Sequence, residues 1–191
     1  MEQAERTQWG IELAVSFRLV IVTMLVCCVG YTALIYGVGQ ALTPYTANGS
    51  LILNGQGQIV GSEQIAQGFT RPEYIWSRPS ATDYAGAGGS NLSPAGSALR
   101  ERAQAALPAM AAEGPVPRDM VTASGSGLDP HLTLEAAEYQ AGRVAEARGA
   151  SREKVLEILR ENAFVPGMGL AEIPLVNVLN VNIALDKALP H

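Results

Sequence analysis

The sequence predicts a single N-terminal transmembrane helix followed by one compact α+β domain, and three observations support this fold class. Residues 19–62 contain no Asp, Glu, Lys or Arg. Within that stretch, residues 19–38 are apolar and long enough, at about 1.5 Å per residue, to cross about 30 Å of hydrocarbon. The remaining sequence combines short strand-like runs with amphipathic helical patterns, which is typical of an α+β domain.

Charge is distributed unevenly along the 191 residues, whose formal net charge is −5. Five of the 31 charged residues precede residue 19 and the other 26 follow residue 62. The C-terminal part therefore has a nearly normal charge content, and the apolar excess belongs to the membrane segment. The acidic balance argues against a nucleic-acid partner, because no cluster of Lys and Arg is available to neutralise phosphates.

The basic residues near the apolar segment predict its orientation. Arg6 and Arg18 precede the segment, whereas the first basic residue on the other side is Arg71. Basic residues favour the cytoplasmic side, so we expect the N-terminus inside and the C-terminal domain outside. A cleaved signal peptide is the alternative, but the apolar run is too long for one and residues 41–44 form a poor cleavage site.

These boundaries divide the chain into four parts. We expect a cytoplasmic lead-in over residues 1–18, the membrane helix over 19–38, a flexible neck over 39–50 and an extracytoplasmic α+β domain over 51–191. Within the membrane segment the small residues are Gly30, Ala33 and Gly37. They would form a packing face for another helix, or else lie against lipid. The only cysteines, Cys27 and Cys28, are adjacent, which argues against a disulfide framework and against a cysteine-ligated zinc site.

Local patterns predict the elements of the domain. They are a β-hairpin turning at residues 54–57, a helix beginning at Ser93–Pro94 and ending before Pro108, a helical turn over 118–123, an αα-hairpin capped by Thr133, Gly149 and Ser151, and a strand over 175–185. In that last strand, Asn180 and Asn182 would project away from the apolar face.

The most unusual segment of the chain, residues 121–131, predicts a tight loop. It collects Ser124, Ser126, Asp129 and His131 within eight residues. A serine-type hydrolase would use one of these serines with His131 as base, but the G-x-S-x-G pattern is missing. Asp129 and His131 lack further ligands of a suitable type nearby, so we predict no metal site.

Two other groups of residues are candidates for binding. The glycine-rich run 85–91 could present several backbone N–H groups to an anion, or it could be a flexible loop without a ligand. It does not match the phosphate-binding P-loop pattern. Gln140 and Arg143 lie three residues apart on one predicted helix, where they would bind a ligand or partner together, or would form a solvated face.

The order of motifs along almost the whole chain resembles the C subunit of the Kdp-type potassium-transporting P-type ATPase. The motifs are GSEQI at 61–65, RPSATDY at 78–84, GGSNL at 88–92, VPRDMVTASGSGLDPH at 116–131, AAEYQAGRVAEARG at 136–149 and VNVLNVNIALD at 176–186. The sequence departs from the family pattern at Ala87, over residues 93–97 and at Leu175, where the family commonly has Ser, an asparagine-containing run and Arg.

The resemblance implies a non-catalytic, single-pass accessory subunit in the bacterial inner membrane. Its partners would be a channel-like potassium-binding subunit, the P-type ATPase subunit and a very small fourth subunit, and potassium would be the ion that the complex transports. Such a subunit is described as a catalytic chaperone that raises the affinity of the ATPase subunit for ATP.

The resemblance also implies site residues. Gly88, Gly89, Ser90 and Asn91 match a loop likened to the signature motif of ABC transporters, and Gln140 and Arg143 match a helix associated with nucleotide. The loop residues in the matching motifs are candidates for partner binding: Arg78, Ser80, Ser124, Ser126, Asp129 and His131.

The implied nucleotide role conflicts with the predicted orientation. A domain outside the membrane cannot reach cytoplasmic ATP across about 30 Å of hydrocarbon. We therefore expect no directly bound cofactor and a main role in assembly, with the outer domain covering the channel-like subunit. A nucleotide-binding module and a membrane-anchored serine-type hydrolase are the alternatives.

Overall fold

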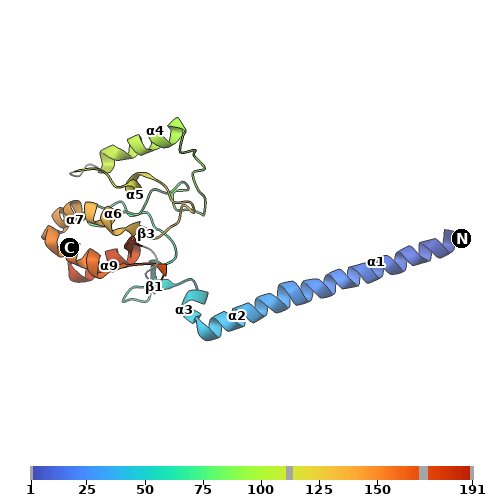
Figure 1. The fold of residues 1–191 in the computed structure, drawn as a ribbon. Coiled ribbons are helices and arrows are strands. Elements are labelled where there is room, and N and C mark those ends of the chain that lie inside the picture. Colours follow the sequence, from blue (N-terminus) through green and yellow to red (C-terminus); the bar gives the residue numbers. More distant parts are fainter. Residues whose placement is uncertain (1, 111–113, 168–171, 190–191) are drawn as a thin grey trace. The chain divides into compact units, whose positions relative to one another are not determined.

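The computed structural model describes residues 2–110, 114–167 and 172–189 (Figure 1). The chain forms two separate units, residues 1–50 and residues 51–191. The boundary between them falls at the end of the predicted neck. The combination of one long apolar helix and a small domain of helices and short strands confirms the predicted fold class.

The first unit is helical over nearly its whole length. Helix α1 (Glu2–Met24), the π-helical turn η1 (Leu25–Gly30) and helix α2 (Tyr31–Leu42) follow one another without a break. The segment Gln8–Leu42 is long and apolar enough to cross a membrane. Its most apolar stretch is 0% buried by other parts of the chain. The residues of the predicted lead-in thus continue without a break into this apolar helical segment.

The segment expected as a flexible neck, residues 39–50, contains a short helix. This helix, α3 (Pro44–Ala47), begins with a proline at its first position, where the missing N–H costs nothing. The side chain of Asn48 then donates to the Pro44 carbonyl (2.7 Å) and exchanges hydrogen bonds with the Gln40 side chain. These local contacts make the neck a structured turn.

The second unit begins with the predicted β-hairpin. Strands β1 (Leu51–Leu53) and β2 (Ile59–Ser62) pair antiparallel, with Leu53 opposite Ile59. The Asn54 side chain closes the turn, because its Oδ1 accepts hydrogen bonds from the amides of Gln56 and Gln58, both at 2.9 Å. The Asn-Gly signal in the sequence therefore predicted this element correctly.

The hydrophobic core of the second unit lies among four helices and a three-stranded antiparallel sheet of order β3-β5-β4. The helices are α6 (Leu134–Tyr139), α7 (Ala141–Arg148), α8 (Arg152–Glu161) and α9 (Val178–Ala188), and the strands are β3 (His131–Thr133), β4 (Ala163–Phe164) and β5 (Leu175–Asn177). Thr133 and Ser151 cap α6 and α8 by accepting backbone hydrogen bonds, and Gly149 ends α7 in the left-handed conformation. The predicted αα-hairpin and its three caps are thus confirmed.

The strand predicted over residues 175–185 is wrong beyond Asn177. Only Leu175–Asn177 form strand β5, and Asn177 then caps helix α9 by accepting from the Asn180 amide. The fully buried side chains of α9 are Val178, Val181, Asn182 and Leu185. Their spacing of three, one and three residues is helical, and it was masked by the alternation of apolar residues with asparagines.

Three smaller elements complete the second unit. Helix α4 (Ser97–Ala106) begins three residues after the predicted position, because residues 93–96 close a turn in which the Gly96 amide donates to the Ser93 carbonyl. It continues into a 3-10 turn, η2 (Leu107–Met110), and the predicted helical turn near residue 118 is α5 (Arg118–Val121). The helix expected after Thr133 is divided at Gln140 into α6 and α7.

Candidate functional site

The glycine-rich run and the serine-rich loop pack against each other. The Gly88 amide donates to the Ser126 carbonyl at 2.7 Å. Gly127 has a φ of 69°, and a Cβ there would collide with the Gly88 carbonyl oxygen. A Cβ at Gly89 would lie 2.8 Å from the Gly125 carbonyl oxygen. We call residues 78–91 together with 124–129 the loop layer; its glycines allow backbone to approach backbone where a side chain would not fit.

Ser80 organises the loop layer through a single hydroxyl group. Its Oγ donates to the Gly127 carbonyl at 2.8 Å and accepts from the amides of Thr82 and Tyr84 at 3.1 and 3.2 Å. The Ser80 carbonyl in turn accepts from Arg102 of α4 at 2.6 Å. Ser80 therefore links both halves of the loop layer and connects them to α4.

The loop layer has unusual backbone geometry next to the glycine-rich motif. Asp83, Tyr84 and Asn91 have positive φ angles of 50°, 61° and 53°. Tyr84 is tied to the start of the loop layer, because its hydroxyl donates to the Arg78 carbonyl at 2.7 Å. Burial raises the pKa of that hydroxyl. Asn91 is exposed, so the end of the motif is accessible.

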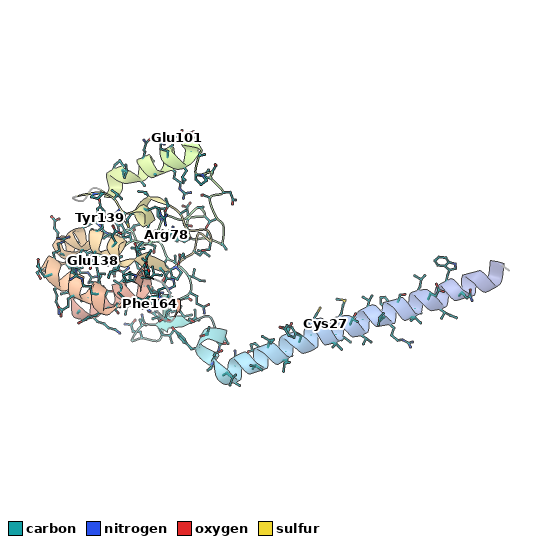
Figure 2. All side chains as sticks on the ribbon, in the orientation of Figure 1. Cys27, Arg78, Glu101, Glu138, Tyr139 and Phe164 are labelled. Atoms are coloured by element: carbon teal, nitrogen blue, oxygen red, sulfur yellow. The ribbon has the colours of Figure 1, made fainter. Side chains whose placement is uncertain are left out.

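Arg78 lies between two carboxylates at the edge of the loop layer. Its guanidinium nitrogens are 3.8 Å from Asp119 and 3.8 Å from Asp129, while its buried Nε has no hydrogen-bond partner among the described residues. Figure 2 shows where Arg78 lies among the side chains of the domain. It lines a pocket of about 540 Å³ with Arg118, Asp129, His131 and other residues. Because Arg78 lines this pocket, its guanidinium group can bind a carboxylate or carbonyl group of a partner.

His131 pairs with Asp129 and not with a serine. Its Nδ1 is 3.2 Å from the Asp129 Oδ1, which also accepts from the His131 amide at 3.0 Å. These hydrogen bonds, with a smaller contribution from Arg78, lower the pKa of Asp129. Ser124 is buried and its Oγ lies 3.4 Å from the Ser126 hydroxyl. Among the described residues, no hydrogen bond joins either serine to His131, so the geometry of a serine hydrolase is missing.

Gln140 and Arg143 bind the domain's own backbone. Gln140 is 4% exposed, and its amide accepts from the Trp76 N–H at 2.8 Å and donates to the Trp76 carbonyl at 3.2 Å. Arg143 donates to Gln140 Oε1 at 2.6 Å and to the carbonyls of Pro72 and Tyr74, and it stacks over the Trp76 ring at 3.8 Å. Burial lowers the pKa of Arg143 to about 10, which leaves it charged at neutral pH.

The same segment is held by two further side chains, Arg148 and Asn182. The expectation that Asn182 projects away from the apolar face is wrong, because its side chain is buried. Asn182 of α9 accepts from the Ile75 amide at 2.8 Å and donates to its carbonyl at 3.0 Å. Arg148 of α7 donates to the Glu73 carbonyl at 2.8 Å. Residues 72–76, which we call the clamped segment, thus have most of their backbone paired by helix side chains, as a neighbouring strand would pair them.

The predicted site residues therefore fall into two environments. The loop layer contains most of them: Arg78, Ser80, Gly88, Gly89, Ser124, Ser126 and Asp129. His131 lies at its edge. Gln140 and Arg143 contact the clamped segment, and no hydrogen bond links them to residues 88–91 among the residues that the structure describes. The helical spacing of Val178, Val181 and Leu185 could have revealed Asn182 as a buried polar residue.

The small residues of the membrane helix are accessible. A Cβ at Gly37 would meet no atom within 4 Å, and one at Gly30 would meet only the Leu25 carbonyl oxygen at 3.5 Å. Ala33 lies on the same side of α2 as Gly37, four residues apart. The nearby Thr23 hydroxyl bonds to the Leu19 and Val20 carbonyls within its own helix, so it does not need a partner.

Comparisons with known proteins give one consistent family. The family model for KdpC, the c chain of the K⁺-transporting ATPase, matches residues 13–187. The KdpC subunit of the potassium-transporting ATPase from Parvibaculum lavamentivorans is 50% identical over 176 residues, covering 90% of this chain and 94% of the relative. The corresponding subunit from Myxococcus xanthus is 44% identical over 181 residues, covering 90% and 86%. That of Burkholderia mallei strain SAVP1 is 43% identical over 182 residues, covering 89% and 94%.

Proposed function

The chain belongs to the KdpC family of subunits of the K⁺-transporting ATPase, and from that premise we propose that it acts as an assembly subunit of the pump. It is an accessory subunit, because the catalytic site of this family's complex resides on another subunit, KdpB. The family membership and the lack of a serine–histidine hydrogen bond among the described residues both contradict the serine-type hydrolase considered from the sequence.

One observation carries the assembly proposal. The most apolar window of the long helix is 0% buried within the chain, whereas residues 51–191 bury their own hydrophobic core. The core of residues 51–191 is thus built from their own side chains, and the apolar surface of the helix is available to lipid and to other membrane subunits. A helix of this kind holds the domain at the complex, which is what an accessory subunit requires.

The proposed helix interface is the side formed by Gly30, the last residue of η1, and by Ala33 and Gly37 of α2. Because these residues leave the backbone open, a helix of the channel-like subunit can approach closely there. The complex also contains the ATPase subunit and the small fourth subunit, and we propose that the outer domain covers the extracellular side of the channel-like subunit. Arg6 and Arg18 support this orientation, which places the N-terminus in the cytoplasm.

Co-purification of the pump in mild detergent tests this interface. Gly37→Leu adds bulk on the open side and should release the other subunits, as should deletion of residues 1–38. The matched control, Ile35→Phe, adds bulk on the opposite side of α2 and should leave the complex intact. Retention of all subunits by the Gly37→Leu variant, or equal loss with the control, would contradict the proposed interface.

For the candidate site, we propose partner binding in place of direct nucleotide binding. Gln140 is engaged by the clamped segment and Arg143, so its amide is not available to a ligand without breaking the core. Exposed Asn91 and the pocket beside Arg78 are accessible. In this account the ATP affinity of the ATPase subunit rises because the complex is correctly assembled.

Calorimetry with ATP on the full-length chain in detergent distinguishes the two roles. We expect no binding heat at millimolar nucleotide. Saturable binding that is lost on replacing Asn91, without loss of the fold, would favour a nucleotide-binding module.

A further inference from the structure

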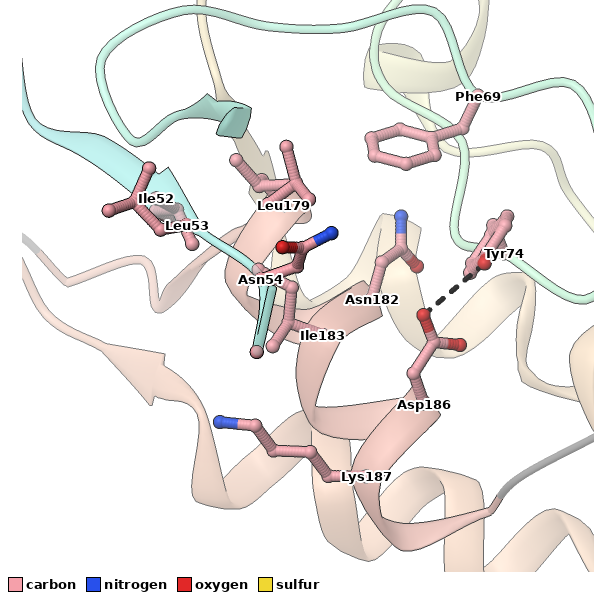
Figure 3. A pocket seen from close by; sticks show the side chains of 12 residues that line it. Ile52, Leu53, Asn54, Phe69, Tyr74, Leu179, Asn182, Ile183, Asp186 and Lys187 are labelled. Atoms are coloured by element: carbon pink, nitrogen blue, oxygen red, sulfur yellow. Dashed lines mark hydrogen bonds between the residues drawn. The ribbon is translucent and has the colours of Figure 1, made fainter. Parts of the chain in front are cut away.

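The hairpin β1–β2 is fixed to the domain and still exposes large apolar side chains. Gly61 allows the close approach, because a Cβ there would lie 2.7 Å from Leu179 Cδ2 of α9. Directly after β2, the backbone and side-chain oxygens of Glu63 accept hydrogen bonds from Asn177 and Asn180 at 2.8 and 3.0 Å. Figure 3 shows Ile52 and Leu53 of the hairpin near Leu179. The hairpin is therefore anchored to α9 and does not need another contact to be held in place.

The anchored hairpin still leaves large apolar side chains in contact with solvent. Leu53 and Ile59, which are directly opposite each other, are 57% and 63% exposed. Leu51 and Val60 are 43% and 38% exposed. We call these four residues the hairpin patch. Singly exposed apolar residues are ordinary, but a group on adjoining strands marks an interaction surface.

The position of the hairpin in the chain identifies what this surface meets. Leu51 follows Leu42, the last residue of α2, by nine residues, which reach at most about 30 Å even when fully extended. Part of this connection is helical, so the actual reach is shorter. The hairpin is thus restricted to the neighbourhood of the membrane surface, whichever side the domain occupies.

The chemistry of the hairpin suits a lipid interface. Residues 51–62 have no ionisable side chain and continue the uncharged stretch that begins in the membrane helix. The polar groups at the tip are largely satisfied internally. The backbone N–H of Asn54 donates to the Gln58 carbonyl, and the backbone N–H of Gly57 donates to the Asn54 carbonyl. The side-chain amide of Asn54 also donates to the side-chain oxygen of Gln58 at 3.0 Å. Entry into a less polar environment therefore leaves few of the turn's polar groups unpaired.

We propose that the hairpin patch inserts shallowly into the headgroup and upper acyl region of the bilayer and is a second membrane contact besides the helix. Amphipathic surface elements bury their apolar side about 5–10 Å into this region. Such a contact restricts rotation and tilt of the domain relative to the membrane. The proposal does not depend on the orientation of the chain, so it can fail while the assembly role stands.

Fluorescence quenching tests the insertion on the full-length chain and on the whole complex. In a background with Cys27→Ala and Cys28→Ala, single cysteines replace Leu53 or Ile59 and carry an environment-sensitive fluorophore. The matched control is Ile173→Cys, since Ile173 is 60% exposed in the same domain but distant in sequence from the membrane helix. The proteins are placed in phosphatidylcholine and phosphatidylglycerol vesicles, and circular dichroism verifies that each variant is folded.

We expect lipids brominated near the headgroup end of the acyl chain to quench most of the emission at positions 53 and 59, and to leave position 173 unaffected. Aqueous iodide should show the reverse order. Protection from both quenchers would show that a protein surface, from another subunit or a second copy, covers the patch, and would overturn the proposal. Quenching by iodide alone would show a solvated hairpin and would overturn it as well.

Discussion

The two parts of the domain that contain the family-implied site residues are held together in different ways. The clamped segment is bound by Gln140, Asn182 and the arginines of α7, whose polar groups lie in or beside the hydrophobic core. The loop layer is bound by the Ser80 hydroxyl and by close contacts between glycine backbones. Damage to the first should therefore destabilise the whole domain, whereas damage to the second should remain local.

This difference separates structural from adaptable residues. A buried amide with every hydrogen bond in use contributes to one rigid arrangement. A loop fixed by a few hydroxyl bonds opens locally at lower free energy, as binding loops commonly do. The loop layer is thus the better candidate for contact with a partner, even though the family resemblance connects both regions with nucleotide.

The largest expected effect is that of Gln140→Leu. The substitution leaves the Trp76 N–H and carbonyl without their partner in a buried environment, so we expect a loss of about 2–4 kcal/mol in the free energy of unfolding. Urea denaturation of the full chain in detergent, followed by Trp76 fluorescence in a Trp9→Phe background, measures it. The control Gln104→Leu, on exposed α4, should change stability by less than about 0.5 kcal/mol. Equal effects of the two substitutions would remove the distinction between the regions.

Gly127→Ala should have the next largest effect, confined to the loop layer. The φ of 69° and the collision with Gly88 make alanine strained there, at a cost of about 1–3 kcal/mol. Hydrogen exchange with mass spectrometry should show faster exchange in residues 78–91 and 124–129, with α7 to α9 unchanged. Gly142→Ala, where no atom lies within 4 Å of the new Cβ, should leave exchange slow or make it slower. Faster exchange throughout the domain would contradict a locally held layer.

Ser80→Ala should loosen the same layer by a smaller amount. Each lost hydrogen bond contributes about 1 kcal/mol or less to stability. The amides of Thr82 and Tyr84 should exchange faster, because both donate to the Ser80 hydroxyl. Amide exchange resolved by NMR measures this, with Ser126→Ala as the exposed control. Unchanged protection at both amides would show that Ser80 does not organise the loop.

Asp129→Asn should have the smallest effect, visible as a change in acid sensitivity. The pKa of Asp129 is lowered in the folded state, chiefly by its hydrogen bond to His131. Its contribution is therefore present above the unfolded pKa, about 3.9, and is lost as pH falls through the lower folded value. Since the side chain is 34% exposed, solvent screening limits the contribution to about 1 kcal/mol or less. As the pH is lowered from 6 to 2, the difference in the free energy of unfolding between wild type and Asp129→Asn should shrink. A difference that stays constant would contradict the lowered pKa of Asp129.

The sequence predicted those elements whose signals are local. Thr133, Ser151 and Gly149 terminate helices through bonds to residues three or four positions away, and Asn54 closes its own turn. Such interactions depend on the identity and spacing of neighbours, which a sequence states directly.

The sequence failed where tertiary contacts decide the outcome. The alternation in residues 175–185 suggested a strand, but Asn182 is required on the inner side of a helix to bind the Ile75 backbone 107 positions earlier. The spacing of Gln140 and Arg143 placed the two residues together, yet the backbone partner of Gln140, Trp76, is 64 residues away and carries no local signal. The approach of Gly127 to Gly88 likewise could not be predicted from two separate glycine-rich loops.

The central claim is that the domain works outside the membrane, in a compartment separated from cytoplasmic ATP, and labelling of single cysteines tests it most directly. In the background with Cys27→Ala and Cys28→Ala, Ser126→Cys should react with a membrane-impermeant maleimide in intact cells, because Ser126 is exposed in the loop layer. Gln8→Cys should react only after the membrane is permeabilised. Labelling of Ser126→Cys only after permeabilisation would contradict the account and would return the nucleotide role to this domain.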